Sequence, residues 1–143
     1  MNTNERDIRK LIDDWTQALR AKDIRKMMAG YASDVVVFDM RLPHKITGAD
    51  ALEKQWMQGL PRIDGPVHCE LTDLHVTAGD DVAFCRCFNR MAFTLQGGEK
   101  VRMCIRATLC FQKIDGRWRD VHEHASVPID MATGKGVTDF EPE

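Results

Sequence analysis

The second half of the chain is a run of four strand-like segments joined by short turns. The segments span about residues 67–77, 82–95, 100–112 and 117–127, each rich in β-branched, aromatic and other apolar residues. Their separators are Gly79-Asp80-Asp81, Gly97-Gly98 and Asp115-Gly116. Because short turns of this kind join neighbouring antiparallel strands, the pattern predicts consecutive hairpins in one sheet.

The first half of the chain is mainly helical in pattern. Apolar residues at helical spacing predict one amphipathic helix from about Asn4 to Ala21, with Asn4 as a possible N-cap. Asp23 can cap a second, shorter helix, and a strand is expected over 34–40. A third helix is expected after Thr47-Gly48-Ala49-Asp50, which resembles a capping box.

Three helices that must bury apolar stripes, followed by a sheet with one apolar face, predict an α+β fold. We expect a cone-shaped, curved antiparallel sheet wrapped around the three N-terminal helices. The domain is expected to cover residues 1–127, and the Pro-, Gly- and acid-rich residues 128–143 are expected to form an exposed tail. A strongly curved sheet cannot be filled entirely by helices, so a pocket open at one end is also expected.

Composition excludes several classes of function. With 143 residues, 43% hydrophobic content and a formal charge of -2, the chain predicts one globular domain without the basic stripe of a nucleic-acid-binding protein. The polar N-terminus and the lack of a long apolar stretch predict neither a signal peptide nor a membrane span, and hence a cytoplasmic location. Five cysteines, an odd number in strand-like segments, are expected to be reduced thiols.

Glu123 is the most chemically informative residue of the last strand. If Lys113 pairs with Arg117 across a three-residue turn, Leu109 lies opposite Val121 and Ala107 opposite Glu123. That register places Glu123 on the apolar face of the sheet. Asp120, together with His122 and His124, is predicted on the opposite, polar face.

A carboxyl group on the buried face of a sheet is a candidate general acid or base. Burial disfavours the charged form and raises the pKa of an acid toward values that suit proton transfer. The alternative is a structural role for Glu123, in which it pairs with a buried arginine or a helix terminus, or is turned outward by a bulge.

Two histidines on one face of a strand, His122 and His124, are a possible metal site. Their predicted position beside Arg106 disfavours a cation, and hydrogen-bonded histidines at a subunit interface are the preferred interpretation. We therefore expect neither a metal nor an organic cofactor.

Three segments resemble the nuclear transport factor 2-like superfamily, and within it the SnoaL-like and ketosteroid-isomerase-like proteins. They are Tyr31-Ala32-Ser33-Asp34-Val35-Val36-Val37-Phe38-Asp39, the helix start at Gly48, and Gly116-Arg117-Trp118 with His122-Glu123-His124-Ala125-Ser126. The resemblance covers about residues 5–127 and implies the same fold. It implies activity less directly, because one scaffold hosts many functions.

The resemblance also implies a site. Asp39 falls where ketosteroid isomerases place their catalytic base, so Asp39 is expected to remove a proton and Glu123 to deliver one. The alternative is that Asp39 only ends its strand by hydrogen-bonding the loop that follows it. Trp15 stands in place of an oxyanion-hole tyrosine, and steroid isomerisation itself is not expected. The residues expected to line the pocket are Trp15, Leu19, Tyr31, Trp56, Ala107, Leu109, Val121 and Ala125.

Two classes of function remain open from the sequence. One is an isomerase, cyclase or dehydratase that moves a proton alpha to a carbonyl of a small hydrophobic ligand. The other is a noncatalytic ligand-binding or oligomerisation module, in line with the similarity of Trp118, His122, His124 and Ser126 to the association domain of calmodulin-dependent kinase. In either case a homodimer through the convex sheet face is expected.

Overall fold

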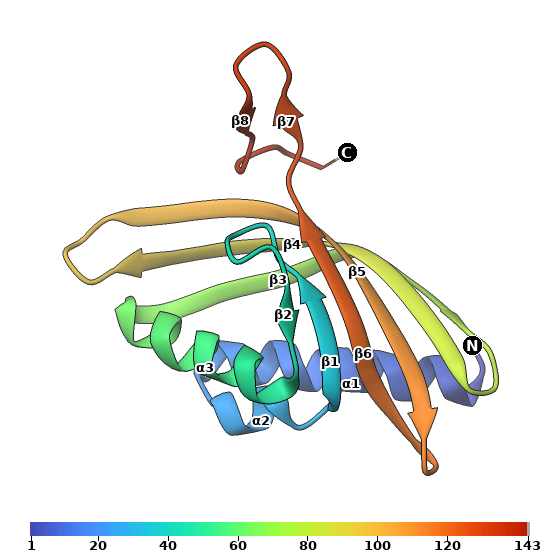
Figure 1. Ribbon diagram of the computed structural model, residues 1–143. Helices are drawn as coiled ribbons and strands as arrows, with labels where there is room; N and C mark the ends of the chain where they lie inside the picture. The colour runs from blue at the N-terminus through green and yellow to red at the C-terminus, as the bar shows by residue number, and fades with distance from the viewer. Residues whose placement is uncertain (143) are drawn as a thin grey trace.

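The computed structural model describes residues 1–142 as three helices under one strongly curved sheet (Figure 1). The helices are α1 (Thr3–Arg20), α2 (Ile24–Met28) and α3 (Ala49–Gly59), with a 3-10 turn η1 (Leu60–Arg62) after α3. The strands are β1 (Tyr31–Phe38), β2 (Ile46–Thr47), β3 (Ile63–Ala78), β4 (Val82–Leu95), β5 (Lys100–Ile114), β6 (Arg117–Ser126), β7 (Ile129–Asp130) and β8 (Lys135–Gly136).

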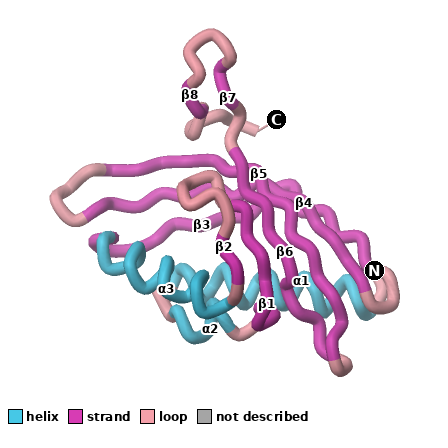
Figure 2. Tube along the Cα trace, viewed as in Figure 1, coloured by secondary structure: helices cyan, strands magenta, loops and turns pink. Residues whose placement is uncertain are grey.

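The main sheet has six strands in the order β2-β1-β6-β5-β4-β3. Consecutive antiparallel hairpins join β3 to β6, as predicted, but β1 pairs with β6 in parallel, so the sheet is mixed rather than wholly antiparallel. The physical reason is that no hairpin joins β1 to β6, and the long connection through α3 leaves their relative direction free. The predicted α+β fold with a curved sheet around N-terminal helices is confirmed (Figure 2).

The N-cap of helix α1 lies two residues before the predicted one. Asn2 is the N-cap, and its side chain accepts a hydrogen bond from the backbone N–H of Glu5 at 2.8 Å. Asn4 instead links the helix to the sheet: its amide donates to the Gly79 carbonyl at 3.0 Å, and its oxygen accepts from Trp118 Nε1 at 3.3 Å. The predicted cap at Asp23 is confirmed, because its side chain accepts from the N–H of Lys26.

The predicted capping box before α3 is wrong. Thr47 belongs to β2, and the N-cap is Gly48, which has φ of +93° and offers no side chain. The Gly48 N–H donates instead to the Val35 carbonyl at 2.7 Å, which ties the start of α3 to β1.

The hairpin between β5 and β6 differs from the predicted register. Asp115 and Gly116 have φ of +52° and +78°, which fits a two-residue turn of type I′, and Ile114 rather than Lys113 pairs with Arg117. A β-bulge near Val121 then adds one more residue to β6. Leu109 therefore lies opposite Glu123, two positions from the prediction, and a shift of two leaves Glu123 on the predicted face.

The C-terminal residues do more than form an exposed tail. The β7–β8 hairpin projects from the sheet in Figures 1 and 2, and the chain then turns back. The N–H of Cys104 donates to the Thr138 carbonyl at 2.7 Å, the Phe140 ring packs on Phe88 at 5.9 Å between centroids, and Glu141 pairs with Arg90. These contacts fix the segment to β4 and β5.

Candidate active site

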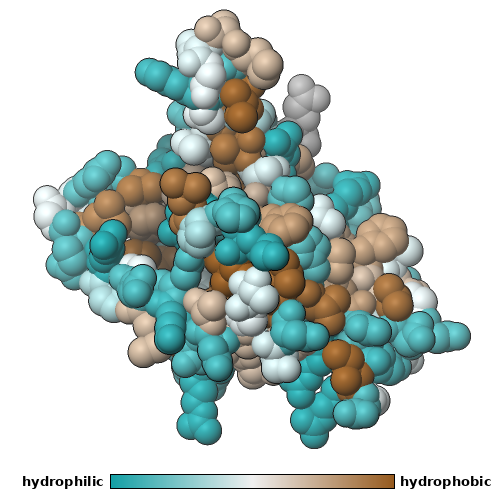
Figure 3. All heavy atoms as spheres, viewed as in Figure 1, coloured by the Kyte–Doolittle hydropathy of each residue, from teal (hydrophilic) through white to brown (hydrophobic). Residues whose placement is uncertain are grey.

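A cavity of about 830 Å³ lies between the concave face of the sheet and the helices. Its wall is mainly apolar and includes the edge-to-face pair of Trp15 and Trp56, whose ring centroids are 6.3 Å apart. In Figure 3 hydrophobic side chains gather on the left of the visible face, near the far end of the β4–β5 hairpin. The volume and lining suit a small, largely hydrophobic ligand.

The structure brings together most residues expected at the pocket. Of the expected residues, those that line the cavity are Trp15, Tyr31, Asp39, Trp56, Ala107, Leu109, Glu123 and Ala125. Leu19 instead is fully buried in the core cluster that contains Met27, Leu60 and Val67. Val121 lies at the bulge of β6, and the extra residue there takes it out of the inward-facing alternation.

Tyr31 and Glu123 meet at the wall of the cavity from two strands that are far apart in the sequence. The Tyr31 hydroxyl donates to Glu123 Oε2 at 3.0 Å. The contact follows from the parallel β1–β6 ladder, in which Val37 pairs with Glu123 and Tyr31 with Asp120. This bond orients the Glu123 carboxyl within the cavity.

Asp120 is the functional candidate that the sequence prediction missed. It lies on the inner face opposite Phe111 and is only 4% exposed, whereas the prediction placed it on the polar outer face. The bulge explains the error: residues before Val121 are displaced by one position relative to those after it, so both Asp120 and Glu123 face inward. Counting β6 from a two-residue Asp115-Gly116 turn would have placed Asp120 inside.

The surroundings of the Asp120 carboxyl favour its protonated form. Burial raises its pKa well above the ordinary value, and the charge of Glu123 and a hydrogen bond between the two side chains raise it further. Among residues 1–142, Asp120 Oδ1 is buried without a hydrogen-bond partner. The pair therefore presents a proton donor and an acceptor side by side.

Tyr31 and Trp15 supply two further donors. Burial raises the pKa of Tyr31 well above its ordinary value, and the charge of Glu123 raises it further, so the phenol stays protonated. The indole N–H of Trp15 lies close enough to the Tyr31 oxygen to oppose that shift. The two groups nevertheless form no hydrogen bond of normal geometry, and Trp15 Nε1 is buried without an acceptor among the described residues. The indole N–H is therefore free to donate to a ligand.

Asp39 is engaged by its own loop. Its Oδ1 accepts from the Met40 N–H at 2.8 Å, and Oδ2 accepts from Arg41 Nη2 at 3.2 Å. The side chain of Asp39 is 19% exposed at the cavity lining. These contacts are those of a carboxylate that ends a strand, the alternative to a catalytic role for this residue.

The two histidines of β6 lie on the outer face of the sheet. His122 Nδ1 is 2.6 Å from the Val36 carbonyl oxygen, and the Phe38 ring packs against both imidazoles at 4.9 and 5.5 Å between centroids. Within residues 1–142 the structure has no group of three or more His, Cys, Asp or Glu side chains placed to hold a metal ion.

In the same range no helix is long and apolar enough to cross a membrane.

A curved sheet over three helices, with a polar cluster at the wall of an apolar cavity, defines a cone-shaped pocket protein. The model of the SnoaL-like domain matches residues 8–130, and the chain belongs to this family. A search of curated proteins found no match.

Solved structures agree with this assignment. An NTF2-like protein of unknown function from Pseudomonas putida is 36% identical, with 96% of each chain covered and a TM-score of 0.87. A ketosteroid isomerase-like protein from Erwinia carotovora atroseptica is 20% identical, with 88% of this chain and 97% of that chain covered and a TM-score of 0.75. A proposed dehydratase of the NTF2-like family from Streptomyces avermitilis is 17% identical, with 90% and 99% covered and a TM-score of 0.77. At such low identity the last two establish the fold alone.

Proposed function

We propose that the cavity binds a small hydrophobic carbonyl compound and that Glu123 and Asp120 transfer protons on it. The observation that carries the proposal is the buried Asp120 carboxyl, with one oxygen unpartnered, beside a Glu123 that Tyr31 orients. A buried polar atom without a partner is costly, and a ligand oxygen would satisfy it. In this proposal Glu123 takes the role of base that was expected for Asp39, and Asp120 takes the role of proton donor.

The proposed reaction is proton transfer through an enol or enolate. Glu123 takes the proton alpha to the ligand carbonyl, and the electron pair of the broken C–H bond moves toward the carbonyl oxygen. Asp120 then donates its one O–H to that oxygen in place of its hydrogen bond with Glu123, and the Trp15 N–H donates a second hydrogen bond there, where negative charge develops. Return of that proton from Glu123 to another carbon completes an isomerisation. Its delivery to a β-hydroxyl, which leaves as water while the enolate electron pair forms the new C=C bond, completes a dehydration.

Deuterium exchange tests this chemistry without knowledge of the natural substrate. Neutral cyclic ketones are incubated with the protein in D₂O, and NMR follows deuterium uptake at the alpha carbon. We expect Glu123→Gln to slow protein-dependent exchange about 100-fold or more, because it removes the proton acceptor. Binding of 2-naphthol, followed by its fluorescence, should change by less than about threefold, since the cavity wall is retained.

Asp39→Asn is the matched control, because it neutralises the other carboxylate at the cavity and should leave exchange within about threefold. Exchange that survives in Glu123→Gln, or is lost in Asp39→Asn, contradicts the proposed roles.

A noncatalytic ligand-binding module is the second candidate. The observation that favours it is the pairing of Asp39 with Arg41, which leaves only one of the two predicted acids free for chemistry. Saturable binding of 2-naphthol by wild-type protein, without ketone exchange above the solvent rate, would select this function.

We also propose a homodimer through the outer face of the sheet. Support comes from large apolar side chains exposed on or beside that face, with Phe84 54% and Val82 58% exposed. Light scattering at tens of micromolar is expected to give twice the 16.3 kDa monomer mass. A monomer mass at that concentration would contradict the proposal.

A cytoplasmic location is likewise proposed, supported by five cysteines that form no disulfide.

A further inference from the structure

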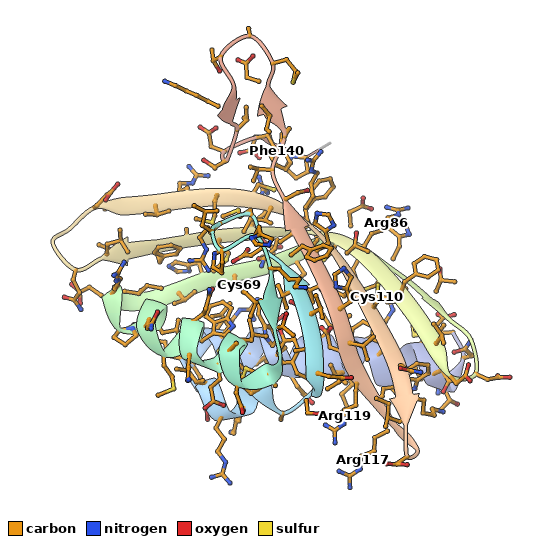
Figure 4. All side chains as sticks on the ribbon, viewed as in Figure 1. Cys69, Arg86, Cys110, Arg117, Arg119 and Phe140 are labelled. Carbon is orange, nitrogen blue, oxygen red and sulfur yellow. The ribbon has the colours of Figure 1, made fainter. Side chains whose placement is uncertain are left out.

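The outer face of the sheet holds a second hollow, of about 370 Å³, that the proposed chemistry does not use. The side chains that define it come from four adjacent strands and are Asp73, Arg86, Phe88, Arg106, Thr108, His124 and Ser126. The register confirms that they are neighbours: Arg86 pairs with Thr108, Phe88 with Arg106, Arg106 with Ser126 and Thr108 with His124. Figure 4 shows Arg86 on the side of the sheet away from the helices.

The hollow carries an excess of positive charge. Its two guanidinium groups, Arg86 and Arg106, face a single carboxylate, Asp73. Arg86 Nη1 is 3.7 Å from Asp73 Oδ2, and the other oxygen of Asp73 is 2.9 Å from His75 Nε2. One guanidinium charge is therefore uncompensated within the lining, next to the hydroxyl donors of Thr108 and Ser126.

On the same outer face of the sheet, another arginine already forms an ion pair with a carboxylate. Further along the β4 and β5 pair, the carboxylate of Glu141 pairs with Arg90, and the adjacent Phe140 ring packs on Phe88. Arg86 lies four residues from Arg90 on the same face of β4. Arginine side chains of this kind bind carboxylate and phosphate groups through paired hydrogen bonds.

We propose that this hollow is a binding site for an oxoanion, such as a phosphate group, held by Arg106 and Arg86 with the hydroxyls of Thr108 and Ser126. The anion removes the charge excess and accepts from donors that surround it on three strands. The volume exceeds that of a phosphate ion, and Phe88 offers a ring face beside it, so a phosphate ester of a small organic molecule also fits.

Isothermal titration calorimetry at low ionic strength tests the site with inorganic phosphate and phenyl phosphate as probes. We expect a saturable isotherm for the wild type and an affinity about tenfold weaker or worse for Arg106→Ala, because charge-assisted hydrogen bonds are lost. Arg102→Ala is the matched control: it removes the same charge from the same face of β5, outside the hollow, and should change the affinity less than about twofold.

Tighter binding of phenyl phosphate identifies a ring-bearing ester and equal binding identifies the free anion, and both support the site. No saturable binding to the wild type, or equal weakening in Arg102→Ala, overturns it. Sedimentation velocity separates the result from dimerisation: weaker binding of Arg106→Ala at unchanged mass supports the site, whereas weakening that accompanies dissociation overturns it.

Discussion

Replacement of Phe111 by alanine is expected to lower the free energy of unfolding by about 3–5 kcal/mol. Phe111 is 1% exposed and packs in the cluster of Ile8, Ile12, Cys85 and Trp118, where α1 meets β4, β5 and β6. Truncation removes apolar contacts and leaves a cavity that rigid neighbours cannot fill. For a domain of this size the midpoint of thermal unfolding should fall by roughly 6–20 °C, measured by circular dichroism.

Phe84→Ala is the control for this prediction. Phe84 has the same side chain but is 54% exposed on the outer face, so at a concentration that keeps the protein monomeric its truncation should change stability by about 0.5 kcal/mol or less. Equal losses for the two variants would contradict the assignment of Phe111 to the core. A larger Phe84→Ala loss at concentrations where the wild type is a dimer would report a subunit interface.

Replacement of Asp120 by asparagine is expected to stabilise the protein above neutral pH and to flatten its pH dependence. Because the pKa of Asp120 is raised in the folded state, first by burial and then by Glu123, the folded state binds more protons than the unfolded state. The wild type therefore loses stability as pH rises from the ordinary pKa of 3.8 through the raised value. Asparagine keeps the side-chain size and removes the titration.

Urea unfolding of both proteins between pH 4 and pH 8 measures this difference. Each unit by which the pKa is raised corresponds to about 1.4 kcal/mol at a pH above both values, or roughly 3–5 °C in the midpoint of thermal unfolding. Asp80→Asn, an exposed residue of the β3–β4 turn, should leave the profile unchanged. An Asp120→Asn protein that keeps the wild-type slope, or is less stable at pH 8, would refute a buried, protonated Asp120.

The order of elements was predictable because each rests on local signals. Helical spacing around Ile8, Ile12 and Leu19 and the turn residues Gly97-Gly98 and Asp115-Gly116 act over a few positions. The parallel pairing of β1 with β6 has no such signal, because it joins segments about 85 residues apart, such as Val37 and Glu123. The C-terminal return to Cys104 and Phe88 is another long-range contact of this kind.

The candidate site also combines a residue that local signals predicted, Glu123, with one that they did not, Asp120. The alternation of β6 predicted an inward Glu123, and a register error of two positions did not change its face. The same alternation placed Asp120 outside, because the bulge at Val121 changes the phase of β6 by one residue and an unbroken alternation cannot place both acids inside.

The amino-acid sequence by itself determined an α+β domain with an apolar sheet face and one acid that points inward, since the spacing of apolar residues and the residues of turns are local properties. Only the tertiary structure decided that Asp120 joins Glu123 and Tyr31 at the cavity and that Asp39 pairs with Arg41. The physical reason is that a carboxyl group's protonation and partners depend on burial and on neighbours supplied by other strands.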